Sequence, residues 1–228
     1  MTRRANARIA GIAFLSYIAL GITAMVLWSK ATAGTGTAAT LASIALHATD
    51  ARVAAVLNLF SSFCALVLAV TLYALTRDQD PDVAMLGLTF RVGEGVVGGM
   101  SIGRSLGLIW LATASGANTP NVETVRALGS FLLHGQGSGS AGMFFAVGST
   151  FFSWLLLRGR MIPAPLAWLG VAASMLTVVG LPLQLLDILP DSATWFIWIP
   201  MAAFEIPLAV WLILRGAAAP SRSPSASF

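Results

Sequence analysis

The chain has 228 residues, of which 57% are hydrophobic and only 10% charged. A soluble domain carries about 25% charged residues, so too few charges remain here to cover a water-facing surface. The net charge of +4 comes from basic residues that stand singly at the ends of apolar runs, which excludes a nucleic-acid surface. Together with a mean hydropathy of +0.84, these features predict an integral membrane protein without a separate soluble domain.

Six apolar runs bounded by charged or turn residues predict six membrane spans. They cover residues 9–29, 53–75, 84–112, 127–157, 164–187 and 194–214. The first run is about twice as long as the apolar region of a signal peptide, so we expect an uncleaved span. Between the first two spans, the apolar patch Leu41–His47 predicts a short interfacial helix within an external loop.

The predicted fold class is therefore all-α, a bundle of six transmembrane helices. We expect one domain over residues 1–216 and a disordered tail over residues 217–228, which are rich in Ala, Pro and Ser.

Basic residues set the expected orientation. A cytoplasmic N-terminus places eight arginines inside and three basic residues outside, which favours both termini in the cytoplasm. The inside set is Arg3, Arg4, Arg8, Arg77, Arg158, Arg160, Arg215 and Arg222, and the outside set is Lys30, Arg52 and Arg126. All seven tryptophans fall near span ends in this arrangement, as an aromatic belt requires.

Glycines recur every fourth residue in the third and fourth spans. Such small-residue faces let two helices approach closely where lipid is as apolar as leucine, so we expect these two spans to pack together. The candidate packing residues are Gly95, Gly99, Gly103, Gly107, Gly135 and Gly139. The alternative, that the glycines make room for a ligand, stays open.

Several polar residues fall at membrane depth, where a central charge costs about 2.5 to 3.5 kcal/mol. Arg91 and Glu94 are three residues apart, so they share a helical face and can pair directly, whereas Arg104 needs another partner. Pro200 and Pro207 flank Glu205 and free backbone carbonyls beside it. The candidate ligand or ion-pair residues are Arg91, Glu94, Arg104, His134, Gln136, Asp187 and Glu205.

Catalytic and metal-binding patterns lack the context that they need. The sequences at 93–98 and 137–142 read G-x-G-x-x-G, and that at 103–107 reads G-x-S-x-G, but all lie within predicted helices. No cluster of Cys, His and carboxylates has metal-site spacing, so we predict neither a metal nor another cofactor. An intramembrane enzyme therefore ranks behind the non-enzymatic alternatives.

Several short motifs resemble one known family. They include Arg8-Ile-Ala-Gly11, Phe90-Arg91 with Glu94, Met161-Ile162-Pro163 with Trp168-Leu169-Gly170, and Glu205 with the stretch Trp211–Gly216. Together they are similar to the bacterial domain of unknown function 4386 family over nearly the whole chain. The resemblance implies a six-helix protein of the bacterial inner membrane, and it transfers no functional residues.

Two classes of function follow. The charged interior between spans three to six favours the handling of a small solute, ion or lipid. The alternative is a non-catalytic accessory subunit whose small-residue faces dock into a larger membrane complex. The expected partners are the lipid bilayer and, in the second case, a membrane protein or another copy of the chain, with no nucleic acid in either case.

Overall fold

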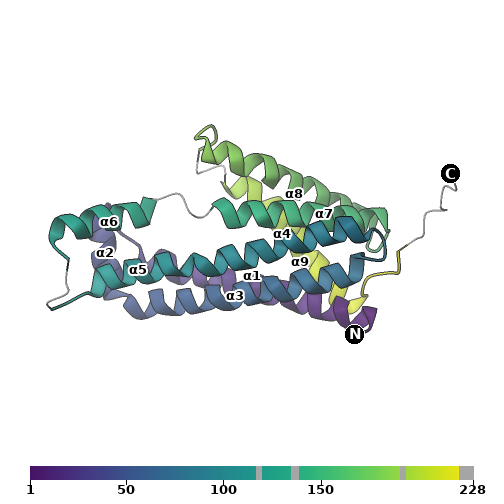
Figure 1. Cartoon of the computed structure of the whole chain (residues 1–228), viewed down its shortest axis with the longest axis horizontal. Coiled ribbons are helices and arrows are strands. Elements are labelled where there is room, and N and C mark those ends of the chain that lie inside the picture. The colour runs from purple at the N-terminus through teal and green to yellow at the C-terminus, as the bar shows by residue number, and fades with distance from the viewer. Residues whose placement is uncertain (117–119, 135–138, 191–193, 221–228) are drawn as a thin grey trace. The chain divides into compact units, whose positions relative to one another are not determined.

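The computed structural model describes residues 1–116, 120–134, 139–190 and 194–220. Within these ranges every regular element is an α-helix (Figure 1). The helices are α1 (Arg3–Ala31), α2 (Thr37–Leu46), α3 (Ala48–Thr76), α4 (Pro81–Met100), α5 (Ile102–Thr113), α6 (Val122–His134), α7 (Gly139–Arg158), α8 (Ala164–Leu185) and α9 (Thr194–Leu214).

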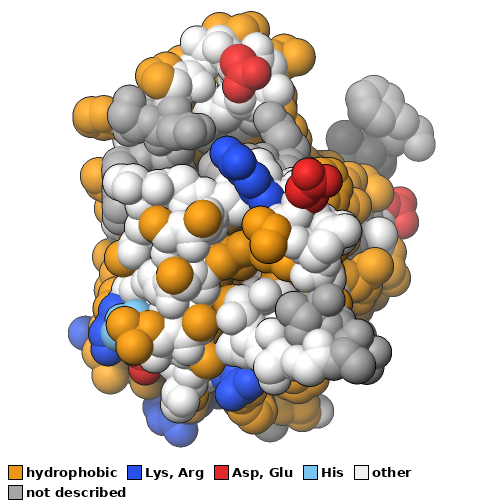
Figure 2. Space-filling model, turned by 90° about the vertical axis from the view of Figure 1, so that its left-hand side faces the viewer, with side chains coloured by type: hydrophobic (Ala, Val, Ile, Leu, Met, Phe, Trp, Pro, Cys, Tyr) orange, Lys and Arg blue, Asp and Glu red, His pale blue; other side chains and the backbone are white. Residues whose placement is uncertain are grey.

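Six helical stretches are apolar and long enough to cross a bilayer. They are α1, α3, α4 together with α5 (Pro81–Thr113), α7, α8 and the Phe196–Leu214 part of α9. This confirms the all-α fold with six candidate spans. The face drawn in Figure 2 mixes hydrophobic side chains with Lys, Arg, Asp and Glu side chains. Elsewhere on the surface, large apolar side chains such as Val70 and Trp168 are exposed. Such a surface is stable where lipid replaces water.

The extent of the predicted fourth span is wrong. Residues 122–134 form α6, and the membrane-length helix α7 begins only at Gly139. With 20 residues α7 alone covers about 30 Å, the thickness of the hydrocarbon core, so it needs no extension. Residues 135–138, between these two helices, lie outside the described residues.

Contacts within the chain group it into two compact units, which we describe separately. Unit 1 comprises residues 1–16, 63–96 and 139–228. Its core contains side chains at most 3% exposed, including Phe14, Leu72, Leu156 and Phe204. Small residues allow close helix contacts, because a Cβ atom at Gly11 would lie 2.5 Å from the Ala209 carbonyl oxygen.

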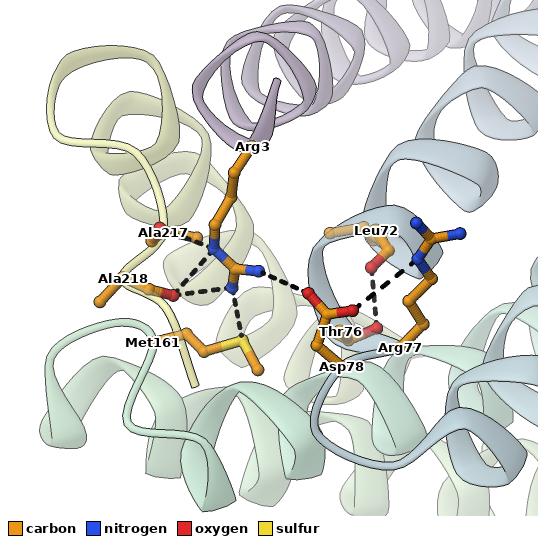
Figure 3. Close-up of polar contacts among 8 residues, drawn as sticks. All are labelled: Arg3, Leu72, Thr76, Arg77, Asp78, Met161, Ala217 and Ala218. Carbon is orange, nitrogen blue, oxygen red and sulfur yellow. Dashed lines mark hydrogen bonds and ion pairs between the residues drawn. The ribbon is translucent and has the colours of Figure 1, made fainter. Parts of the chain in front are cut away.

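Four segments of unit 1 meet around Arg3, at the start of α1 (Figure 3). Its guanidinium donates to the Ala218 carbonyl at 2.7 Å, contacts the Met161 sulfur at 3.3 Å and lies 3.7 Å from the Asp78 carboxylate. The Ala218 amide in turn donates to the Met161 carbonyl at 3.0 Å. The beginning of α1, the loop after α3, the loop before α8 and the segment after α9 are thereby held together.

Unit 2 comprises residues 17–62 and 97–138. Its core joins α2 and α5 with the end of α1, through buried residues that include Ala31, Ile44 and Leu108. Helix α2 confirms the helix predicted around Leu41–His47, and its interfacial place outside the cell stays a prediction.

The predicted division into one domain over 1–216 and a tail over 217–228 also stays a prediction. Helices α1 and α3 each run through both units without a break. Of the predicted tail, residues 221–228 lie outside the described residues, while Ala217 and Ala218 accept hydrogen bonds from Arg3.

Candidate functional site

Three helices of unit 1 carry a polar side chain near their midpoints. Arg91 lies ten residues into α4, Ser149 ten residues into α7 and Glu205 eleven residues into α9. At 1.5 Å per residue, each of these positions is about 15 Å from the start of its helix, which is half of a typical hydrocarbon core. The sequence therefore brings polar groups to the depth at which their burial is most costly.

Arg91 and Glu94 form the ion pair that their spacing predicts. The distance from Arg91 Nη1 to Glu94 Oε2 is 2.8 Å, and the two residues are 1% and 5% exposed. The same Nη1 donates to Ser149 Oγ at 3.4 Å, which links α4 to α7. Because the pair is nearly dry, its mutual attraction is much stronger than that of a surface pair.

Helix α7 shapes the space that the Arg91 side chain occupies. A Cβ atom at Gly148 would lie 2.7 Å from Arg91 Cγ and 3.0 Å from Cδ, so only glycine leaves room for the aliphatic stem. The ring of Phe145, one turn earlier, lies under the guanidinium, with 4.7 Å between Arg91 Cζ and the ring centroid. Stem and head group are both held by α7.

The other edge of this guanidinium has no acceptor among the described residues. Nε and Nη2 of Arg91 are buried without a hydrogen-bond partner there. A buried donor left unpaired costs about 1 to 3 kcal/mol, and more when it is charged. An unpaired charged donor inside a membrane protein is therefore a place where a further group is expected to bind.

Glu205 adds a second carboxyl group to this region. It is 6% exposed and lies within electrostatic range of both Arg91 and Glu94, although no direct ion pair joins it to Arg91. Pro200 and Pro207 cannot donate backbone hydrogen bonds to the carbonyls four residues earlier, so the carbonyls of Phe196 and Ala203, which both precede Glu205 along α9, lack that helical donor. The site thus combines one guanidinium and two carboxyl groups.

The remaining candidates lie elsewhere or outside the described residues. Arg104 belongs to unit 2, where its guanidinium donates to the backbone carbonyls of Leu132 and Leu133 at the end of α6. It therefore caps a helix C-terminus, where a cation is favourable. Asp187 is exposed in the turn after α8. The side chain of His134 and all of Gln136 lie outside the described residues, so their predicted roles stay predictions.

The predicted packing glycines have different surroundings. Gly99 and Gly103 have no described atom within 4 Å of where a Cβ would lie, whereas Gly107 would meet Leu132 at 3.3 Å and Gly139 would meet Leu185 at 3.2 Å. Gly95 is buried in α4, and Gly135 lies outside the described residues. That these glycines form a common face along which the third and fourth spans pack together stays a prediction.

Contacts between α4 and α7 involve glycines that the spacing argument missed. A Cβ at Gly87 would meet the Phe152 ring at 3.1 Å, and one at Gly93 would meet the Phe144 ring at 2.7 Å. Phe145, Gly148 and Ser149 were missed as well. A search of the sequence for a small residue next to a hydroxyl residue could have found Gly148 and Ser149. On a facing helix, such a pair leaves room for the stem of a buried arginine and offers an acceptor to its guanidinium.

Unit 2 contains a cavity of about 660 Å³ between the starts of α2 and α6. Its lining combines threonine hydroxyls, apolar side chains and Arg126, and it contains none of the predicted site residues. In the described part of the chain, no group of three or more His, Cys, Asp or Glu side chains could hold a metal ion.

The six apolar helices and the buried ion pair define the chain as a multi-pass membrane protein with charged residues inside its helix packing. A family model, Domain of unknown function (DUF4386), matches residues 9–216. The chain therefore belongs to this family, as the resemblance of its motifs predicts. No curated protein and no solved structure matches it.

Proposed function

We propose that this chain handles a small solute, ion or lipid through the charged interior of unit 1, around Arg91, Glu94 and Glu205. The observation that carries the proposal is that two buried nitrogens of Arg91, Nε and Nη2, have no hydrogen-bond partner among the described residues. A charge pair kept only for stability gains little over apolar side chains of similar volume, so an incompletely satisfied pair at mid-membrane depth favours a functional role.

Charge balance supports the same reading. One guanidinium stands beside two carboxyl groups, so the three groups carry an excess negative charge when all are ionised. Proton uptake or a bound cation would neutralise that excess. Sites of this kind mark ion and substrate pathways in membrane proteins.

We further propose that the protein lies in the bacterial inner membrane with both termini in the cytoplasm. Supporting this, Arg3, Arg77 and Arg158 pair with Asp78 or Asp80, in the region of unit 1 where the beginning of α1 meets the segment after α9. Arginines concentrated at one end agree with the positive-inside rule. Single cysteines at positions 35 and 79, introduced into a Cys64→Ser background, test this, because only position 35 should react with an impermeant thiol reagent.

Native mass spectrometry of the protein, gently extracted from its own membrane, tests the function. We expect a bound small molecule or lipid on the wild type and on Arg158→Gln, and its loss from Arg91→Gln with unchanged helix content. A stoichiometric partner protein that stays bound to Arg91→Gln, with no small molecule on any variant, would favour the accessory-subunit alternative.

A further inference from the structure

The unpartnered atoms of Arg91 form a recognisable chemical surface. A guanidinium presents the N–H groups of Nε and Nη2 along one edge, parallel and spaced to match the two oxygens of a carboxylate or phosphate. Glu94 and Ser149 both use Nη1, on the other side of the group. The edge that is left is the one best suited to bind an oxyanion with two hydrogen bonds.

This edge is fixed in place. Glu94 holds Nη1 at 2.8 Å, the Phe145 ring covers a face of the guanidinium, and Gly148 confines the stem. A side chain held in this way loses little conformational entropy when a ligand binds. The edge is also dry, since the whole residue is 1% exposed, so each hydrogen bond to an anion would be strengthened by the low dielectric.

We propose that the Nε and Nη2 edge of Arg91 is the subsite for a single oxyanion head group, a carboxylate or a phosphate, for which the Glu205 carboxylate competes. The inference rests on the proposed function and names its ligand class. Glu205 is a second acidic group within electrostatic range of Arg91, besides Glu94, which already binds Nη1. An incoming oxyanion excludes the Glu205 carboxylate from this edge, and Glu205 then takes up a proton, so that the negative charge of the region does not increase.

A dissolved anion and an anionic lipid both present this chemistry to Arg91, and the experiment distinguishes the two sources. The purified protein is therefore placed in nanodiscs of neutral phosphatidylcholine and titrated with sodium acetate or inorganic phosphate, at constant ionic strength set with chloride. In a second arm, the nanodiscs contain phosphatidylglycerol and no added oxyanion. The readout is the midpoint of thermal unfolding, which rises when a ligand binds the folded state.

We expect a saturable rise of the midpoint with at least one oxyanion, or with phosphatidylglycerol, that chloride alone does not produce. Arg91→Lys keeps the charge but loses the two-point edge, so its affinity should fall at least tenfold. Glu205→Gln removes the competitor, so its affinity should rise several-fold. Arg104→Lys, the matched control in unit 2, should bind as the wild type does. If Arg91→Lys does not fold, Gly148→Ala is used instead, because its Cβ displaces the Arg91 guanidinium without changing the charge of the site.

Three results would overturn the subsite. One is the absence of a rise with every oxyanion and lipid, and another is equal affinity in Arg91→Lys and the wild type. The third is weaker binding by Glu205→Gln, which would mean that Glu205 helps to hold the ligand. A different result would reject the oxyanion and leave the proposed function standing. In that case the unfolding midpoint would be higher in sodium chloride than in choline chloride, and Glu205→Gln would abolish the difference.

Discussion

Removing the charge of Glu94 tests how much of unit 1 depends on the buried ion pair. In Glu94→Gln, Arg91 loses its partner at 2.8 Å while it stays 1% exposed, so a cation is left nearly uncompensated inside the helix packing. Breaking a buried pair in this way costs about 3 to 5 kcal/mol of unfolding free energy. Removing both charges together, in Arg91→Met with Glu94→Gln, should cost much less, because no unpaired charge remains.

A double-mutant cycle measures this difference. The two single variants and the double variant are unfolded reversibly in mixed micelles, and the coupling energy is the double variant's loss minus the sum of the single losses. We expect a coupling of about 2 to 4 kcal/mol in favour of the pair. Adding Glu205→Gln to Glu94→Gln should destabilise further, since Glu205 is the remaining carboxyl group within electrostatic range of Arg91. A coupling below about 0.5 kcal/mol would refute the view that the pair is dry and tightly coupled.

Three further substitutions probe other contacts. Gly148→Ala places a Cβ 2.7 Å from Arg91 Cγ, so overpacking should lower the free energy of unfolding by about 1 to 3 kcal/mol. In the control Gly36→Ala no described atom lies within 4 Å of the new Cβ, so only the strain of the positive φ should destabilise the protein. Thermal unfolding of both variants measures the difference. Arg104→Ala should expose the last carbonyls of α6 and speed hydrogen exchange throughout that helix, while unchanged exchange would mean that water replaces the guanidinium fully. Arg3→Ala should free the segment at Ala218 and speed its proteolysis, with Arg4→Ala as the control, and equal cleavage of both would contradict the role of the Arg3 contacts.

Most of the fold could be predicted because apolar run length reports directly on membrane spans. The prediction is wrong where an amphipathic helix adjoins a span. The largely apolar run from 127 to 157 does not reveal that α6 and α7 are separate helices. Hydropathy averages over a window and therefore does not distinguish an amphipathic helix such as α6 from part of a span. Helix α6 also packs against α2, since a Cβ at Gly129 would lie 3.0 Å from the Leu41 side chain, and hydropathy does not report such a contact.

The candidate site divides in the same way. The pairing of Arg91 with Glu94 depends on helix geometry alone, so the spacing of three residues predicted it. The contribution of Ser149 depends on which helix faces α4, which is tertiary information. The partner of Arg104 could not be predicted at all, because it consists of backbone carbonyls, which every residue carries and no sequence pattern marks.

The contacts of Arg3 also bear on how the chain could be reconnected. With Arg3 bonded to Ala218 and within 3.7 Å of Asp78, the two ends of the described chain and the loop between α3 and α4 are neighbours. A circularly permuted protein, in which a short linker joins residue 218 to residue 3 and the chain is opened after Gln79, would keep every span in its present direction. The order in which the helices are synthesised would change, with α4 first and α3 last. Such a chain would separate what the sequence order contributes to membrane insertion from what the packed helices contribute.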